Sequence, residues 1–110
     1  MLSLVLAAAL TLSDPTATPV QVDSPLAPLH GTLLTPEGGT RAAAVIIAGS
    51  GPTDRDGNSP LGVSAGSYRL LAEGLAEHGV ATVRYDKRGA GESVAALGNE
   101  ADLRFEHMVR

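Results

Sequence analysis

The order of apolar and polar residues along the chain predicts short strands first and a β-α-β unit after them. The opening run, MLSLVLAAALTL, is apolar apart from Ser3 and Thr11. The segments VQVDSP and LHGTLLTP then contain β-type residues and end at prolines, which is typical of short strands at a sheet edge. The following run, AAAVIIAG, is apolar without polar alternation and predicts a strand covered on both faces, as in a parallel sheet.

A long polar loop follows this apolar run. Residues 49–66, GSGPTDRDGNSPLGVSAG, are rich in Gly, Ser, Pro, Asp and Asn. Ordered loops of this length in a compact domain tend to be functional. A loop that leaves the carboxyl end of a strand is well placed to bind a ligand, because its peptide N–H groups can point at negative charge.

A helix and a second strand come next. Ser67 is expected to cap the helix SYRLLAEGLAEH, and Gly79 supplies the left-handed residue that ends it. The apolar stripe of this helix consists of Leu70, Leu71, Ala72 and Leu75. The segment VATVRYD predicts a second covered strand. Strand, loop, helix and strand together form one βαβ unit, whose crossover is expected to be right-handed.

Composition limits the function classes. A chain of 110 residues makes one domain at most, and 44% hydrophobic content suits a globular fold. A net charge of −4 and 3% aromatic residues do not suit a nucleic-acid surface, so we expect no nucleic-acid partner. The chain has no cysteine, and its histidines, His30, His78 and His107, lie far apart without ligand spacing. We therefore expect no metal and no other cofactor; His78, at a helix end, suits the helix dipole and needs no catalytic role.

The two ends of the chain are interpreted separately. The N-terminal apolar run is too short to span a bilayer but suits a signal peptide, although no Lys or Arg precedes it. A buried element or a misassigned start codon is the alternative. We expect residues 1–18 to be a signal peptide and linker, residues 19–110 to be a domain, and the protein to be exported (periplasmic or secreted) rather than cytoplasmic. The C-terminal segment DLRFEHMVR has helical spacing without a cap, so we expect the chain to end inside a helix.

The pentapeptide GVSAG at residues 62–66 matches the G-x-S-x-G pattern of a serine nucleophile. A nucleophile elbow needs a buried strand directly before the serine, whereas the residues before Ser64 include DGNSPL, which breaks strands. No histidine has a reason to approach Ser64, so a general base is lacking as well. We interpret Ser64 as a loop residue rather than a nucleophile.

The loop also contains a partial match to a calcium site. Asp54, Asp56 and Asn58 hold the first, third and fifth positions of a calcium loop. Ser59 and Ala65 replace the glycine and the glutamate that such a loop needs, so we expect a polar loop that hydrogen-bonds its own backbone. The segment GSGPTD lacks the third glycine of a dinucleotide-binding fingerprint, and no P-loop lysine follows it.

The segment RYDKRGAGES forms the second glycine-rich turn. Its notable residues are Asp86, Arg88, Gly89, Gly91 and Ser93. The turn could hold an anion. We favour a structural role, in which Asp86 and Arg88 bind backbone groups of a turn that leaves a strand.

Three segments taken together, VIIAGSGPTDRDGN, YRLLAEGLAEHG and VATVRYDKRGAGES, resemble the N-terminal part of the α/β-hydrolase superfamily. The similarity is greatest to the bacterial serine aminopeptidase (S33-like) and esterase branch and runs from about Val20 to the C-terminus. The AGSGPTDRDGN loop and the D-x-R-G-x-G-x-S turn are specific when found together at this spacing. The resemblance implies an incomplete α/β fold, in which short N-terminal strands precede a βαβ unit of a mostly parallel sheet.

The same resemblance implies where catalytic groups belong. In that superfamily the loop after the third strand supplies one backbone N–H of the oxyanion hole, which here would be the N–H of Ser50 or Gly51. Ala48 stands where relatives often carry a histidine. The nucleophile, the acid and the histidine would lie beyond Arg110, so no catalytic side chain is expected in this chain.

The resemblance implies a parent hydrolase that cleaves carboxylic esters or amides/peptides, with a small-molecule ester or a peptide as substrate. Its Ser-His-Asp triad would act through an acyl-enzyme, and this chain alone would be inactive. The alternative is a non-catalytic module that binds a small anion or metal with the loop from Gly49 to Gly66. The fragment would also leave one side of its central strand unpaired, which favours aggregation.

Overall fold

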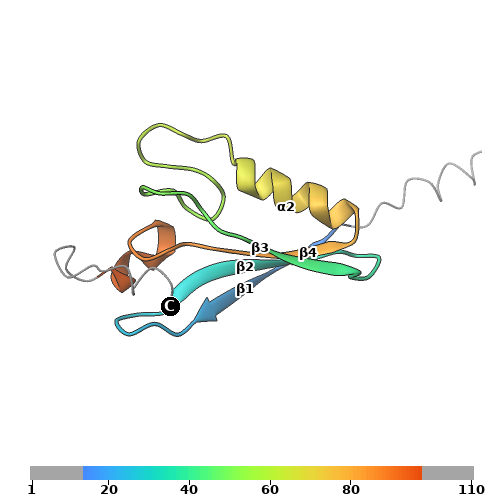
Figure 1. Ribbon diagram of the computed structural model, residues 1–110, viewed down its shortest axis with the longest axis horizontal. Coiled ribbons are helices and arrows are strands. Elements are labelled where there is room, and N and C mark those ends of the chain that lie inside the picture. Colours follow the sequence, from blue (N-terminus) through green and yellow to red (C-terminus); the bar gives the residue numbers. More distant parts are fainter. Residues whose placement is uncertain (1–13, 98–110) are drawn as a thin grey trace, which may run out of the picture.

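The computed structural model describes residues 14–97, which form a four-stranded sheet with one α-helix lying on one face (Figure 1). In chain order the elements are β1 (Thr16–Val22), β2 (Leu29–Thr35), β3 (Ala42–Ile46), α2 (Ser67–Glu77), β4 (Val80–Tyr85) and the 3₁₀ helix η1 (Gly91–Ala96). The expected signal peptide, up to residue 13, and the C-terminal helical segment lie outside the described residues.

The sheet is mixed, with the strand order β1-β2-β4-β3. β1 and β2 are antiparallel, β2 and β4 are antiparallel, and β3 and β4 are parallel, with Ala42 opposite Val80 and Ile46 opposite Arg84. The βαβ unit predicted from the sequence is therefore confirmed, as is the incomplete α/β fold. Because β3 and β4 are parallel, the loops that leave their carboxyl ends meet at one edge of the sheet.

β1 begins at Thr16, inside the range 1–18 that the sequence assigned to a signal peptide and linker. The strand includes Pro19, which pairs in register with Thr32. A proline is tolerated at this position because β1 is an edge strand, whose outer side needs no backbone donors.

The apolar stripe predicted for α2 is displaced in the structure. Its buried residues are Ala72 and Ala76, which pack with Leu34 and the partly buried Ile46, while Leu70 is 54% exposed. Successive residues are about 100° apart around an α-helix, so Leu70 lies about 200° from Ala72 and faces away from the sheet. Two alanines bring the helix close to the sheet, so the predicted stripe is confirmed at Ala72 and wrong at Leu70 and Leu71, which are exposed.

The ends of α2 are fixed by backbone groups. The predicted side-chain cap by Ser67 is wrong, since the N-cap residue is Gly66, with φ 63° and no side-chain cap. The carbonyl of Asp56 instead accepts the N–H groups of Tyr68 at 3.1 Å and of Arg69 at 3.4 Å. At the other end the prediction for Gly79 is confirmed, because it has φ 81° and its N–H donates to the Ala76 carbonyl at 3.0 Å. In the described range 14–97, no helix combines the length and apolarity needed to cross a bilayer.

β3 is the outermost strand on its side of the sheet. The prediction that it is covered on both faces is wrong for the described residues. Val45 is 62% exposed and Ile47 is 68% exposed. Side chains alternate along a strand, so Ile46 reaches the cluster under α2 while Val45 and Ile47 share the opposite face. The apolar run AAAVIIAG predicts burial on both faces of β3, but the described elements cover only the face toward α2.

Candidate functional site

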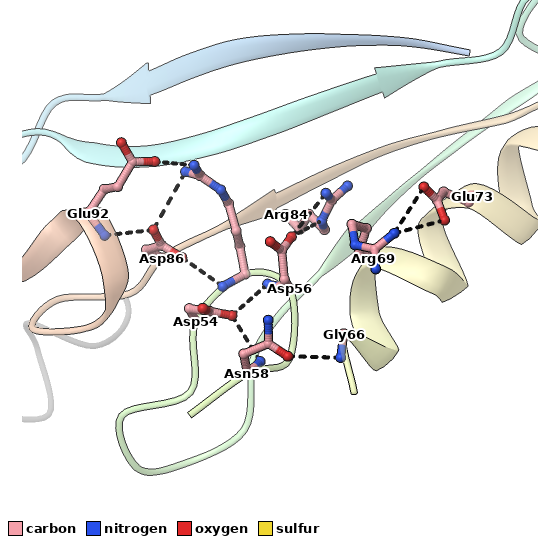
Figure 2. Close-up of polar contacts among 10 residues, drawn as sticks. Asp54, Asp56, Asn58, Gly66, Arg69, Glu73, Arg84, Asp86 and Glu92 are labelled. Carbon is pink, nitrogen blue, oxygen red and sulfur yellow. Dashed lines mark hydrogen bonds and ion pairs between the residues drawn. The ribbon is translucent and has the colours of Figure 1, made fainter. Parts of the chain in front are cut away.

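Two loops meet at the carboxyl edge of β3 and β4, and Asp86 joins them (Figure 2). Its Oδ1 accepts the N–H of Arg55 at 2.7 Å, and its Oδ2 accepts the N–H of Glu92 at 2.9 Å. The Arg55 guanidinium lies 3.5 Å from the same carboxylate and also pairs with the Glu92 side chain. The Asp86 side chain is only 3% exposed, so these contacts replace its hydration.

The structural role favoured for the turn RYDKRGAGES is confirmed. Arg88 donates to the carbonyl of Ala96 at 3.4 Å. The buried Ser93 hydroxyl accepts the N–H of His30 at 3.0 Å, which ties the turn to β2. At Gly91, φ is 48° and an added Cβ would lie 2.4 Å from a carboxylate oxygen of Asp86, so only glycine fits there.

The acidic residues of the long loop are used internally, as predicted for a loop that hydrogen-bonds its own backbone. Asp54 Oδ1 accepts the N–H groups of Asp56 and Asn58, each at 2.9 Å. Asn58 Oδ1 accepts the N–H of Gly66 at 2.8 Å, and Asp56 Oδ1 accepts two donors of the buried Arg84, at 3.1 and 3.2 Å (Figure 2). Within residues 14–97 no three His, Asp or Glu side chains gather as metal ligands would.

Ser64 lies in an exposed part of the same loop. The residues before it form a tight turn, in which Ser59 and Val63 bridge each other and the Ser59 N–H donates to the Val63 carbonyl at 2.8 Å. No strand leads directly to Ser64, and no described residue other than glycine has a positive φ. The strained strand-to-helix turn of a nucleophile elbow is therefore not formed around Ser64.

The two backbone donors singled out from the sequence, Ser50 and Gly51, lie just beyond the carboxyl end of β3. Both residues are exposed, and neither N–H donates to another described residue. Gly51 has φ 84°, a left-handed conformation that glycine adopts without strain. A backbone N–H that no described residue accepts is available to donate to an anionic oxygen.

The residue before them, Gly49, has both of its polar backbone groups bound by side chains that sequence reasoning missed. Its N–H donates to the Tyr68 hydroxyl at 3.4 Å, and its carbonyl accepts a hydrogen bond from Lys87 Nζ. Burial lowers the pKa of the Lys87 ammonium. The available signal was position, because Lys87 is the second residue after β4, which is parallel to β3, and Tyr68 lies in the first turn of the helix after the loop.

Comparisons with protein-family models and with curated proteins find no match. Solved structures do match. A cold-adapted esterase from an Arctic intertidal metagenomic library has a TM-score of 0.57 at 16% identity, over 82% of this chain and 35% of the esterase. A dienelactone hydrolase from Anabaena variabilis has a TM-score of 0.53 at 23% identity, over 86% of this chain and 38% of that chain.

A third structure, an α/β serine hydrolase without a lid from Xanthomonas campestris, has a TM-score of 0.50 at 23% identity. The match covers 76% of this chain and 36% of that chain. This chain thus spans little more than a third of the length of each of these hydrolases. Sheet order, helix placement and these three likenesses show that the described residues have part of the α/β-hydrolase fold.

Proposed function

We propose that this chain is the N-terminal part of a serine hydrolase that cleaves carboxylic esters or amides/peptides. The triad of Ser, Asp or Glu, and His would lie beyond Arg110, in that chain order. The observation that carries the proposal is the pair of exposed N–H groups of Ser50 and Gly51 at the carboxyl edge of β3, which donate to no described residue. The esterase and hydrolase likenesses of the fold support it.

In the proposed reaction the serine oxygen forms a bond to the substrate carbonyl carbon while the triad histidine takes the serine proton, and the carbonyl π electrons move onto the carbonyl oxygen. The N–H of Ser50 or Gly51 donates to that oxyanion, and a second donor comes from the residue after the nucleophile. Loss of one such donor costs about 2.7–4 kcal/mol of transition-state stabilisation. The contribution of this chain is therefore electrostatic, because it holds a donor still while charge develops.

The surrounding contacts suit this task. Asp86 binds the backbone at Arg55 and at Glu92, so the loop after β3 is anchored to the turn after β4. Asp56 binds Arg84 through its side chain and the start of α2 through its carbonyl. A donor loop tied at several points needs little reorganisation during the reaction, and fixed dipoles of this kind stabilise charge best.

The first experiment concerns the chain itself. We expect no burst of p-nitrophenol from p-nitrophenyl acetate with the 110-residue chain, because no described serine has the strained turn or the base of a nucleophile. Ser64→Ala is the control. A burst that this substitution abolishes would place the nucleophile at Ser64 and contradict the proposal.

The second experiment concerns the parent protein. Its coding sequence past residue 110 should contain a strand followed by G-x-S-x-G within about 50 residues. That serine should react with a fluorophosphonate probe, and its replacement by alanine should abolish labelling. A reading frame without the pattern, or a parent protein that the probe does not label, contradicts the assignment.

Substrate class and location are the finer parts of the proposal. We assign the parent to the S33-like aminopeptidase or esterase branch, and we propose that residues 1–18 direct its export. A panel of p-nitrophenyl esters and aminoacyl p-nitroanilides separates esterase from aminopeptidase activity. N-terminal sequencing of the mature protein tests export, because an intact Met1 would show that no signal peptide is removed.

A further inference from the structure

Lys87 and Tyr68 reach Gly49 from two different elements. Lys87 lies in the turn after β4, and its Nζ donates to the Gly49 carbonyl. Tyr68 lies in the first turn of α2, and its hydroxyl accepts the Gly49 N–H at 3.4 Å. Gly49 itself is exposed, so neither contact is needed to satisfy a buried backbone group. The two side chains therefore hold backbone groups of Gly49 that water could otherwise hydrate.

The carbonyl of Gly49 and the N–H of Ser50 belong to one peptide unit. This unit is planar and trans, so its C=O and N–H point in opposite directions. A contact that fixes the Gly49 carbonyl therefore also fixes the direction of the Ser50 N–H. Glycine offers little resistance to rotation of the adjoining peptide, so without an anchor the unit can turn over and point its N–H elsewhere.

We propose that Lys87 is a positioning residue that locks the peptide between Gly49 and Ser50, so that the Ser50 N–H stays directed at the oxyanion. This inference rests on the proposed function. Lys87 does not touch the substrate in this arrangement. Its ammonium also polarises the peptide along the C=O to N–H direction, which makes the N–H a stronger donor.

The lock has a charge dependence. A charged donor forms the stronger hydrogen bond, and burial lowers the pKa of Lys87 from its ordinary value of 10.5. The ionisable groups that the contacts place near Lys87 are Tyr68 on α2, which also binds Gly49, and the adjacent residue Asp86, whose carboxylate is paired with Arg55. The lock should weaken as the pH rises through the pKa of Lys87, below 10.5.

Nuclear magnetic resonance on the full chain tests the contact without any substrate. Lys87 is the only lysine, because Arg accounts for the other seven of the 8 Lys and Arg residues, so ¹³Cε-labelled lysine gives one unambiguous signal. A carbonyl–nitrogen correlation joins the Gly49 carbonyl to the Ser50 nitrogen and does not depend on amide exchange. We expect this correlation to shift as Lys87 titrates, with the same midpoint as the ¹³Cε signal of the lysine. The shift should persist in Tyr68→Phe, which removes the phenol that also binds Gly49. A correlation that ignores the lysine titration overturns the proposal.

Activity of the parent hydrolase tests the consequence. Lys87→Met should lower kcat by about 10-fold or more with KM nearly unchanged, since removal of a whole oxyanion donor costs about 10²–10³ in kcat. Lys87→Arg should restore most of kcat and abolish the alkaline decline, because arginine stays charged. Arg41→Met is the matched control, because Arg41 donates to the carbonyl of His78 at 2.6 Å, at the opposite end of β3.

The two experiments separate the two hypotheses. If the Gly49–Ser50 correlation titrates with Lys87 but the parent protein hydrolyses no substrate, the contact is supported and the proposed function is contradicted. Hydrolysis with an unchanged kcat in Lys87→Met supports the function and overturns the positioning role. A loss of kcat that Lys87→Arg does not restore also overturns the role, because it would make the lysine important for some reason other than its charge.

Discussion

Replacement of Asp86 by asparagine should weaken the structure at the point where the two loops meet. The substitution keeps the size of the side chain and removes its charge. One oxygen remains to accept a backbone N–H, from either Arg55 or Glu92. The new amide group then faces the other N–H, so two donors oppose each other in a site where the native side chain is 3% exposed.

The size of the effect follows from these contacts. A hydrogen bond to a charged group contributes about 1.5–3 kcal/mol, and a buried donor left without a partner costs about 1–3 kcal/mol. The ion pair between Asp86 and Arg55 is lost as well, although its 3.5 Å separation makes it a small part. Because the remaining bond and local relaxation recover some of the loss, we expect Asp86→Asn to lower the free energy of unfolding by about 2–4 kcal/mol. Small domains have about 5–15 kcal/mol in total.

Equilibrium urea unfolding followed by circular dichroism measures this difference. Glu92→Gln is the matched control, since it also removes one negative charge near Arg55 but from a side chain that is 62% exposed. Exposed ion pairs contribute about 0–1 kcal/mol, so the control should unfold close to the native chain. A loss below about 1 kcal/mol for Asp86→Asn, or an equal loss for both variants, would refute the reasoning.

Three further predictions follow from other parts of the structure. Gly91→Ala should lower the free energy of unfolding by about 1–3 kcal/mol or more, because φ is 48° and the new Cβ would clash with Asp86. Gly74→Ala, on the open surface of α2, should raise it by about 0.5–1 kcal/mol. Thermal unfolding compares the two variants, and equal effects would contradict the argument. The isolated chain should self-associate through the unpaired edge of β3. In analytical ultracentrifugation, Val45→Lys should lower the average molecular mass more than Val94→Lys, which changes a similarly exposed valine on η1. Equilibrium dialysis with calcium should find no specific binding, because the loop carboxylates already bind Arg84 and backbone N–H groups; saturable calcium binding would favour the non-catalytic module.

Local signals predicted most of the elements, and the errors occurred where a neighbour decided the outcome. The strand β2, the strand β4 and the end of α2 at Gly79 follow from periodicity and glycine chemistry. The cap of α2 was assigned to Ser67, but a carbonyl from Asp56, eleven positions earlier, serves its N–H groups. The predicted stripe was right at Ala72 and wrong at Leu70 and Leu71. Leucine is more apolar than alanine and was expected to be buried, but close packing on the sheet selects the smaller side chain.

By itself the sequence determined the alternation of strands and helix and the polar loop between them, because these depend on residues close together in the chain. The amides of Ser50 and Gly51 became candidate donors only through the resemblance to α/β-hydrolases, and their role stays a proposal. Only the tertiary structure decided that Asp86 binds the backbone at Arg55 and that Lys87 binds Gly49, contacts that join positions 31 and 38 residues apart. Such pairs leave no local pattern. They exist because parallel strands bring their carboxyl ends, and the loops that follow them, to the same edge of the sheet.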